Sequence, residues 1–177
     1  MARHVVLIGM MGSGKTTIGR ILARRLNRAF LDTDREIERR TGQTVSQIFA
    51  LQGEAAFREQ ETELLRDLLD WPRSTVIATG GGIVVRERNL DLLKQLGIVV
   101  WLTMSPDSLV ERLRYSRRQG RPLLQTEHWP EVVRRLMVER SASYRRAADL
   151  ALAVDGLAPG QVVAEVMRHL RPMERRR

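Results

Sequence analysis

Eight residues near the beginning of the chain, GMMGSGKT at 9–16, have the types and spacing of a phosphate-binding loop. They follow the pattern G-x-x-x-x-G-K-[ST]. Glycines let successive backbone N–H groups turn toward one anion, the lysine can reach β- and γ-phosphates, and the threonine hydroxyl suits Mg²⁺. A strand-to-helix turn that binds nothing is the alternative. We expect a nucleoside triphosphate site, with these contacts: Gly12, Ser13, Gly14, Lys15, Thr16 and Thr17.

Two carboxylates, Asp32 and Asp34, stand close together in the segment LDTD. They end an apolar run, and ligands of open α/β sheets bind at the carboxyl ends of the strands. Side chains two residues apart in an extended chain point the same way, so one acid could hold Mg²⁺ or its waters while the other accepts a proton from an attacking alcohol. Asp34 could instead cap the following helix. The strand expected at 75–78 ends without an acid, which favours Asp32 on the magnesium side.

Three consecutive glycines, Gly80, Gly81 and Gly82, follow another apolar run. Each glycine loses much conformational entropy on folding, so a plain turn seldom needs three of them. We expect a ligand to approach the backbone amides closely here; a flexible loop is the alternative.

Two arginines lie on predicted helices in apolar surroundings. Arg58 precedes Glu61 by three residues, so the two could simply pair on the helix surface. Arg140 lies between Leu136 and Tyr144 at i,i+4 spacing, where an arginine either extends to water or meets an anion. Two such arginines suit bidentate capture of a substrate carboxylate.

These residues require a scaffold that brings them to one edge, and the hydrophobic pattern predicts such a scaffold. Apolar runs typical of buried strands lie at 5–8, 29–31, 75–78, 98–102 and 150–154. Helical patterns lie between and after them, at 16–26, 34–40, 44–70 with a break near Gly53, 86–96, 106–115, 130–147 and 159–170. Thr44 and Gln47 have the spacing of a capping box, and Ser105 with Pro106 suits a helix start. This alternation predicts an α/β fold with a parallel sheet.

The composition of the 177 residues fits one globular domain, expected at 1–171, with a disordered basic tail at 172–177. The chain has no cysteine and no run long enough to span a membrane, which favours a cytoplasmic protein without disulfides. Its net charge of +9 suits nucleic acid or small anionic substrates. Only 5% of the residues are aromatic, so a base-stacking surface is poorly supported and we favour small anions.

Taken in order, the motifs GMMGSGKT, LDTD, FRxxE, GGG, RPLL and RxxxY resemble those of the shikimate kinases, over residues 4 to 165. The resemblance implies a three-layer α/β/α P-loop fold, with a five-stranded parallel sheet in the order 2-3-1-4-5 and a mobile lid at about 116–129. It also implies that the protein uses ATP and Mg²⁺ to phosphorylate the 3-hydroxyl of shikimate, on the way to chorismate and the aromatic amino acids. No feature of the sequence demands a dimer, and we expect a monomer.

The resemblance further implies a role for each site residue. Lys15 would contact the β- and γ-phosphates, Thr16 would bind Mg²⁺, and Asp32 would act on the metal through water. Asp34 would bind the shikimate hydroxyls and serve as base. Arg121 of the RPLL motif would neutralise charge on the transferring phosphoryl group. The shikimate carboxylate would lie on Arg58 and Arg140, with Gly80, Gly81 and Gly82 beside the ring.

Other functions are compatible with parts of this pattern. A related small-molecule kinase, such as one for gluconate, would share the phosphate loop but should lack the combination of LDTD, FRxxE and GGG. A nucleotide-dependent nucleic-acid-binding protein is favoured only by the charge. The motifs leave open whether Arg112 or Arg114 stacks on adenine, and residues 156–158 offer it no polar side chain.

Overall fold

The computed structural model describes residues 4–115 and 122–176. The strands are β1 (His4–Ile8), β2 (Ala29–Asp32), β3 (Thr75–Ala78), β4 (Gly97–Thr103) and β5 (Leu150–Ala153). The helices are α1 (Lys15–Leu26), α2 (Thr33–Thr41), α3 (Val45–Gln52), α4 (Glu54–Leu69), α5 (Glu87–Leu96), α6 (Pro106–Tyr115), α7 (Trp129–Ala147) and α8 (Pro159–Arg176), with a short 3₁₀ turn η1 (Pro122–Leu124).

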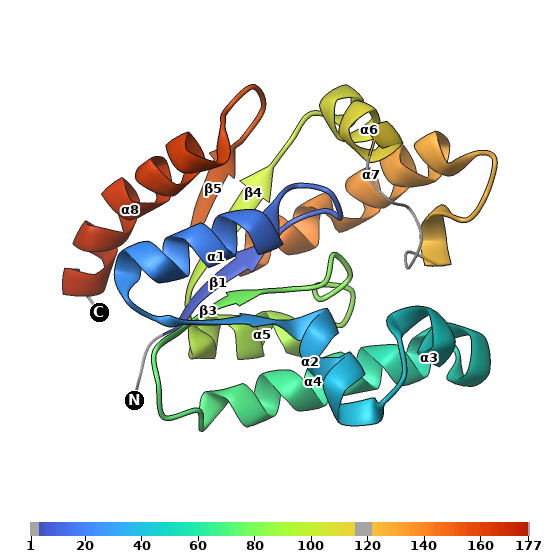
Figure 1. The fold of residues 1–177 in the computed structure, drawn as a ribbon, viewed down its shortest axis with the longest axis horizontal. Helices are drawn as coiled ribbons and strands as arrows, with labels where there is room; N and C mark the ends of the chain where they lie inside the picture. The colour runs from blue at the N-terminus through green and yellow to red at the C-terminus, as the bar shows by residue number, and fades with distance from the viewer. Residues whose placement is uncertain (1–3, 116–121, 177) are drawn as a thin grey trace.

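The strands form one parallel sheet in the order β2-β3-β1-β4-β5, which confirms the expected fold and strand order. Alternate residues of β1 face opposite sides, and both sides are buried. Helices α1 and α8 cover one face, while α4, α5 and α7 cover the other (Figure 1). Burial on both faces explains why the inner strands β1, β3 and β4 read as continuous apolar runs, while the edge strands β2 and β5 remain partly exposed.

Helix α5 packs between α4 and α7 on the second face. Its buried Asn89 accepts a hydrogen bond from Thr62 of α4 at 2.8 Å and donates to the carbonyl of Ile83, also at 2.8 Å. At its first turn, Glu87 pairs with Arg146 of α7. Apolar packing, a buried hydrogen bond and an ion pair thus place α5 between the two helices that carry Arg58 and Arg140.

Two predicted helix starts are confirmed, and so is the predicted break near Gly53. Thr44 and Gln47 form the expected capping box at the start of α3. Ser105 Oγ accepts from the backbone N–H of Ser108 at 3.3 Å, at the start of α6. Gly53 separates α3 from α4.

The C-terminal segment differs from the expectation. Helix α8 continues to Arg176, so residues 172–176, expected as a disordered tail, are helical in the structure. Met173 packs against the apolar cluster beneath α8, which gives this last part of the helix a buried contact.

None of the described helices combines the length and the apolar character that a membrane span requires.

Candidate active site

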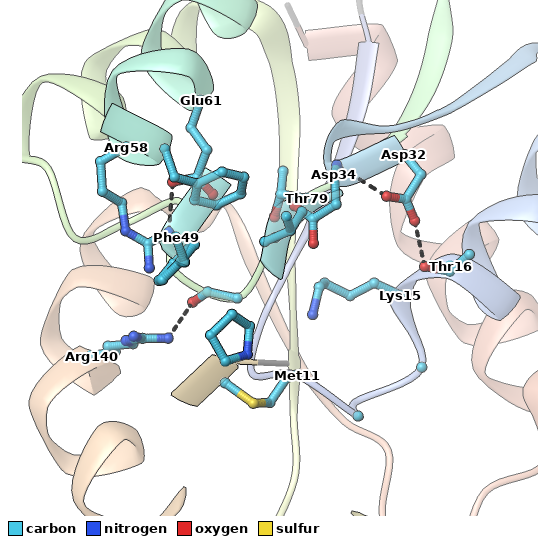
Figure 2. A pocket seen from close by; sticks show the side chains of 18 of the residues that line it. Met11, Lys15, Thr16, Asp32, Asp34, Phe49, Arg58, Glu61, Thr79 and Arg140 are labelled. Carbon is cyan, nitrogen blue, oxygen red and sulfur yellow. Dashed lines mark hydrogen bonds and ion pairs between the residues drawn. The ribbon is translucent and has the colours of Figure 1, made fainter. Parts of the chain in front are cut away.

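A pocket of about 300 Å³ opens where β1, β2 and β3 end. Figure 2 shows Lys15, Thr16 and Asp32 on one side, Arg58 and Arg140 on the other, and Asp34 between the two groups. The lining consists of the following residues: Met11, Gly12, Gly14, Lys15, Thr16, Thr17, Asp32, Asp34, Val45, Phe49, Phe57, Arg58, Glu61, Thr79, Gly80, Gly81, Gly82, Pro122 and Arg140.

The phosphate loop joins β1 to α1. Gly12 and Gly14 have φ angles of 82° and 97°, a left-handed conformation that side chains disfavour. Lys15 begins α1, and its Nζ donates to the carbonyls of Gly9 and Met10, both at 2.8 Å. These bonds hold the ammonium group across the mouth of the loop, beside the N-terminus of α1, where an anion is favoured.

Ser13 is placed differently from the other expected contacts of the loop. It is fully buried and is absent from the pocket lining; it lines instead a second cavity of about 200 Å³ beneath the loop. The loop therefore presents the side chain of Ser13 to the protein interior, while Thr16 and Thr17 line the pocket.

Asp32 links β2, α1 and α2. Its Oδ2 accepts from Thr16 Oγ1 at 2.7 Å, and its Oδ1 accepts from the backbone N–H groups of Asp34 and Arg35 at 3.2 and 3.3 Å. Asp32 is thus the N-cap of α2, and the alternative in which Asp34 caps this helix is wrong. Because Asp32 takes the capping position, Asp34 lies in the first turn, with its side chain on the pocket.

Asp34 is half-buried, but its Oδ1 atom is buried and has no hydrogen-bond partner among the described residues. Burial, and then the neighbouring carboxylates of Glu61 and Asp32, raise the pKa of Asp34 to about 7. Lys15 and Arg58 oppose this shift. An acid with a pKa near neutrality can exchange a proton with a substrate at working pH.

Two of the three glycines, Gly80 and Gly82, make room for charged side chains of the pocket. A Cβ atom on Gly80 would lie 2.6 Å from Asp34 Oδ1, and a Cβ on Gly82 would lie 2.2 Å from Nη1 of Arg58. The sequence predicted that a ligand approaches these glycines closely; in the structure, the side chains of Asp34 and Arg58 also approach them. Gly80 further donates its N–H to Thr33 Oγ1 at 3.0 Å, which ties the glycine segment to α2.

Both arginines are nearly inaccessible, with 5% of Arg58 and 6% of Arg140 exposed. Arg58 pairs with Glu61 at 2.7 Å as the spacing suggested, but the pair is buried and not on the surface, because this face of α4 packs beneath the pocket. Arg140 donates to the carbonyl of Gly81 at 3.1 Å. Tyr144, one turn on, donates to the same carbonyl, and so joins α7 to the glycine segment.

Several residues of the site carry a weak signal in the sequence. Glu54 accepts from Arg58 and could have been found from its i,i+4 spacing on the same helix. Phe49 and Val45 line the pocket from α3, and no local pattern distinguishes them from core residues. Arg112, rather than Arg114, reaches the phosphate loop, where it donates to the carbonyl of Gly12 at 3.4 Å.

Arg121 lies outside the described residues, as does the expected lid from 116 up to that position. Its neighbour Pro122 begins η1 and lines the pocket.

The donor groups present fit the ligands that the motifs imply. Thr16 and Asp32 offer a hydroxyl and a carboxylate, the hard oxygen ligands that Mg²⁺ accepts. The residues that the structure describes contain no cluster of three or more His, Cys, Asp or Glu side chains arranged for a metal. This agrees with the usual binding of Mg²⁺ by one or two protein groups together with substrate phosphates.

Comparisons with known proteins support a specific family. A family model described as shikimate kinase matches residues 11–171. The shikimate kinase of Chromohalobacter salexigens is 43% identical over 164 residues, which cover 93% of this chain and 89% of that one. The shikimate kinase of Symbiobacterium thermophilum is 42% identical over 167 residues, which cover 94% and 95%.

Solved structures agree. A shikimate kinase from Acinetobacter baumannii in complex with shikimate has a TM-score of 0.91 at 38% identity, over 97% of this chain and 94% of that chain. A gluconokinase from Sinorhizobium meliloti has a TM-score of 0.60 at 15% identity, over 97% of this chain and 93% of that chain, and shares the fold alone.

Proposed function

The chain belongs to the shikimate kinase family, and on that premise we propose how its pocket transfers the γ-phosphoryl group of ATP to the 3-hydroxyl of shikimate. The products are shikimate 3-phosphate and ADP, a step toward chorismate and the aromatic amino acids.

The phosphates of ATP belong on the side of the phosphate loop. Lys15 lies at the mouth of this loop with its ammonium group held by two carbonyls, and we assign it to the β- and γ-phosphates. Thr16 and, through water, Asp32 would hold Mg²⁺, which when bound neutralises charge on these phosphates. The backbone of Gly12 and Gly14 and the hydroxyl of Thr17 complete the nucleotide side.

Arg121 retains the role that the resemblance implies, neutralisation of charge on the transferring phosphoryl group. Its neighbour Pro122 lines the pocket, which supports this assignment.

Shikimate belongs on the opposite side, with its carboxylate on Arg58 and Arg140. Both guanidinium groups are almost completely removed from solvent, so their fields are poorly screened and favour an anion. Gly80, Gly81 and Gly82 lie between the two arginines and Asp34, and the absence of side chains there leaves space for the ring.

Asp34 lies between the two sides and is assigned as the base. As the 3-hydroxyl oxygen attacks the γ-phosphorus, Asp34 accepts the hydroxyl proton, and the bond from the γ-phosphorus to the oxygen bridging it to the β-phosphate breaks. The electron pair of that bond leaves with ADP. A pKa near 7 suits this exchange, since the acid is partly ionised before the reaction and can release its proton afterwards.

The observation that carries this proposal is the position of Asp34 between a phosphate loop and two buried arginines. It is tested by ADP release from Mg-ATP with shikimate, quinate, gluconate and nucleoside monophosphates as acceptors. We expect turnover with shikimate and much less with the uncharged amide of shikimate, because the amide gives up its charge-assisted bonds to both arginines. Preferential turnover of gluconate or of a nucleoside monophosphate would contradict the proposal.

A further inference from the structure

Arg58 is held by two carboxylates of its own helix. Its Nε and Nη2 donate to Glu54 Oε1 at 3.1 and 2.8 Å, and its Nη1 donates to Glu61 Oε2 at 2.7 Å. One positive charge thus faces two negative charges before any substrate is present. Even with Arg140 nearby, a substrate carboxylate would compete with these two carboxylates for Arg58 unless one of them moves away.

The two carboxylates differ sharply in their freedom to move. The side chain of Glu61 is fully buried, and it carries a raised pKa because burial disfavours its charged form. The side chain of Glu54 is 46% exposed. Glu54 can therefore leave Arg58 and be solvated, whereas Glu61 would lose its partner without reaching water.

Other groups restrict the remaining approaches to the guanidinium. Gly82 lies against its outer end, where a Cβ atom would be 2.2 to 2.3 Å from Nη1, Cζ and Nη2. The rings of Phe49 and Phe57 lie near it, with their centroids 5.9 and 5.4 Å from Cζ. The Nε–Nη2 edge, which Glu54 occupies, is the edge that a mobile partner can vacate.

We propose that Glu54 is a positioning residue that occupies the carboxylate subsite of Arg58 and exchanges with the substrate carboxylate. The inference rests on the proposed function, because it takes Arg58 as a ligand of the shikimate carboxylate. Before substrate binds, Glu54 holds Arg58 in place. Displacing Glu54 costs binding free energy, and only an anionic substrate offsets this cost through its own bonds to Arg58. Uncharged analogues leave the internal ion pair intact and gain nothing from Arg58.

The test compares Glu54→Gln with Glu63→Gln by calorimetric titration of shikimate without nucleotide, and by shikimate KM in turnover. The amide introduced by Glu54→Gln keeps a neutral acceptor for Arg58 but removes the competing charge. Glu63→Gln is the matched control, since it removes one carboxylate from the exposed surface of the same helix. A charge-assisted hydrogen bond exceeds a neutral one by about 1 kcal/mol, so we expect Kd and KM to fall about fivefold in Glu54→Gln and by less than about twofold in the control.

A double-mutant comparison isolates the pair. In an Arg58→Ala background, Glu54→Gln should leave shikimate affinity unchanged, because the group for which the two anions compete is gone. Weaker binding by Glu54→Gln would show that Glu54 only orients Arg58, and unchanged binding would show that it does not compete; either result overturns the exchange while the proposed function stands. If the wild type binds no shikimate, the proposed function fails and the exchange fails with it.

Discussion

At the scale of single residues, the basic side chains that line the described pocket are held by protein neighbours before a ligand arrives. Lys15 is held by two carbonyls, Arg140 by the carbonyl of Gly81, and Arg58 by two carboxylates. Asp34 differs, because its buried Oδ1 has no partner among the described residues and its pKa is raised to about 7. The acid that we assign to proton transfer thus has unused bonding capacity, as does the buried Oε1 of Glu61.

The pH dependence of turnover follows from this pKa. Since the ionised form of Asp34 accepts the proton, kcat/KM for shikimate should rise with pH and level off above a midpoint near 7. Asp34→Asn should lower kcat/KM by about 10² to 10⁴ and remove this rise. Initial rates between about pH 5.5 and 9 at saturating Mg-ATP measure both effects; a midpoint that persists in Asp34→Asn belongs to another group.

The same shift should affect stability with the opposite sign. The folded chain keeps the proton of Asp34 up to about pH 7, while the unfolded chain releases it near 3.8. The contribution of Asp34 to the free energy of unfolding is therefore fully present below pH 3.8 and is lost as the pH rises toward 7. Urea unfolding of the ligand-free protein at several pH values should show a smaller decline over this range in Asp34→Asn than in the wild type.

Gly82→Ala should weaken shikimate binding without a comparable loss of stability. The new methyl group would overlap the guanidinium of Arg58, the far end of a flexible side chain, so Arg58 should shift while the fold persists. We expect shikimate KM to rise at least about tenfold, which corresponds to about 1.4 kcal/mol, and the melting temperature to change little. Gly160→Ala is the control, because the position has no atom within 4 Å of the new Cβ. A variant with normal KM would show that Arg58 does not need its observed position.

At the scale of elements, the site is assembled where strand ends meet helix starts. Asp32 ends β2, caps α2 and accepts from Thr16 in the first turn of α1. One side chain therefore fixes the relative position of three elements beside the phosphate loop.

Two substitutions of Asp32 should separate its role as the cap of α2 from its role near Mg²⁺. Asp32→Ala removes the N-cap and should lower the free energy of unfolding by about 1 kcal/mol, whereas Asp32→Asn keeps an acceptor for the α2 amides and should cost much less. Both should raise the Mg²⁺ concentration at which turnover is half-maximal, because both remove the charge near Thr16. Urea unfolding and Mg²⁺ titrations of turnover measure the two effects; equal stability of both variants would argue against the cap.

The sequence predicted the elements well because their signals are local. Periodicity placed every strand to within a residue or two, and the capping box at Thr44 needed only four residues. The contacts that build the site are not local. Gly82, which lies between β3 and α5, lies against Arg58 of α4, and Tyr144 donates to Gly81, 63 positions away. No short window of sequence contains both partners of either contact. Asp32 and Asp34 could not be separated as cap and pocket acid, since either residue type suits either place.

At the scale of the whole molecule, the described surface bears on the oligomeric state. The exposed large apolar side chains, Leu51, Val85, Tyr115 and Val138, are distributed over separate segments of the described structure. Single exposed apolar residues are normal on a protein surface and do not by themselves mark an interface.

We therefore expect a monomer in solution. Light scattering after size exclusion should give a mass near the 20.3 kDa of one chain, and specific activity should not depend on enzyme concentration. A dimer whose dissociation on dilution abolishes activity would contradict this expectation.

The position of α5 has a consequence for how substrate choice can change. Arg58 and Arg140 stand on α4 and α7, and α5 is the spacer between those helices, joined to one through Asn89 and to the other through Glu87. A bulkier or smaller side chain in the buried face of α5 would alter the gap between the two arginines without touching either. Substitutions in α5 can thus be selected that admit acceptors of a different size, or that confer resistance to an inhibitor built around a fixed carboxylate. A map of ligand contacts would not include these positions.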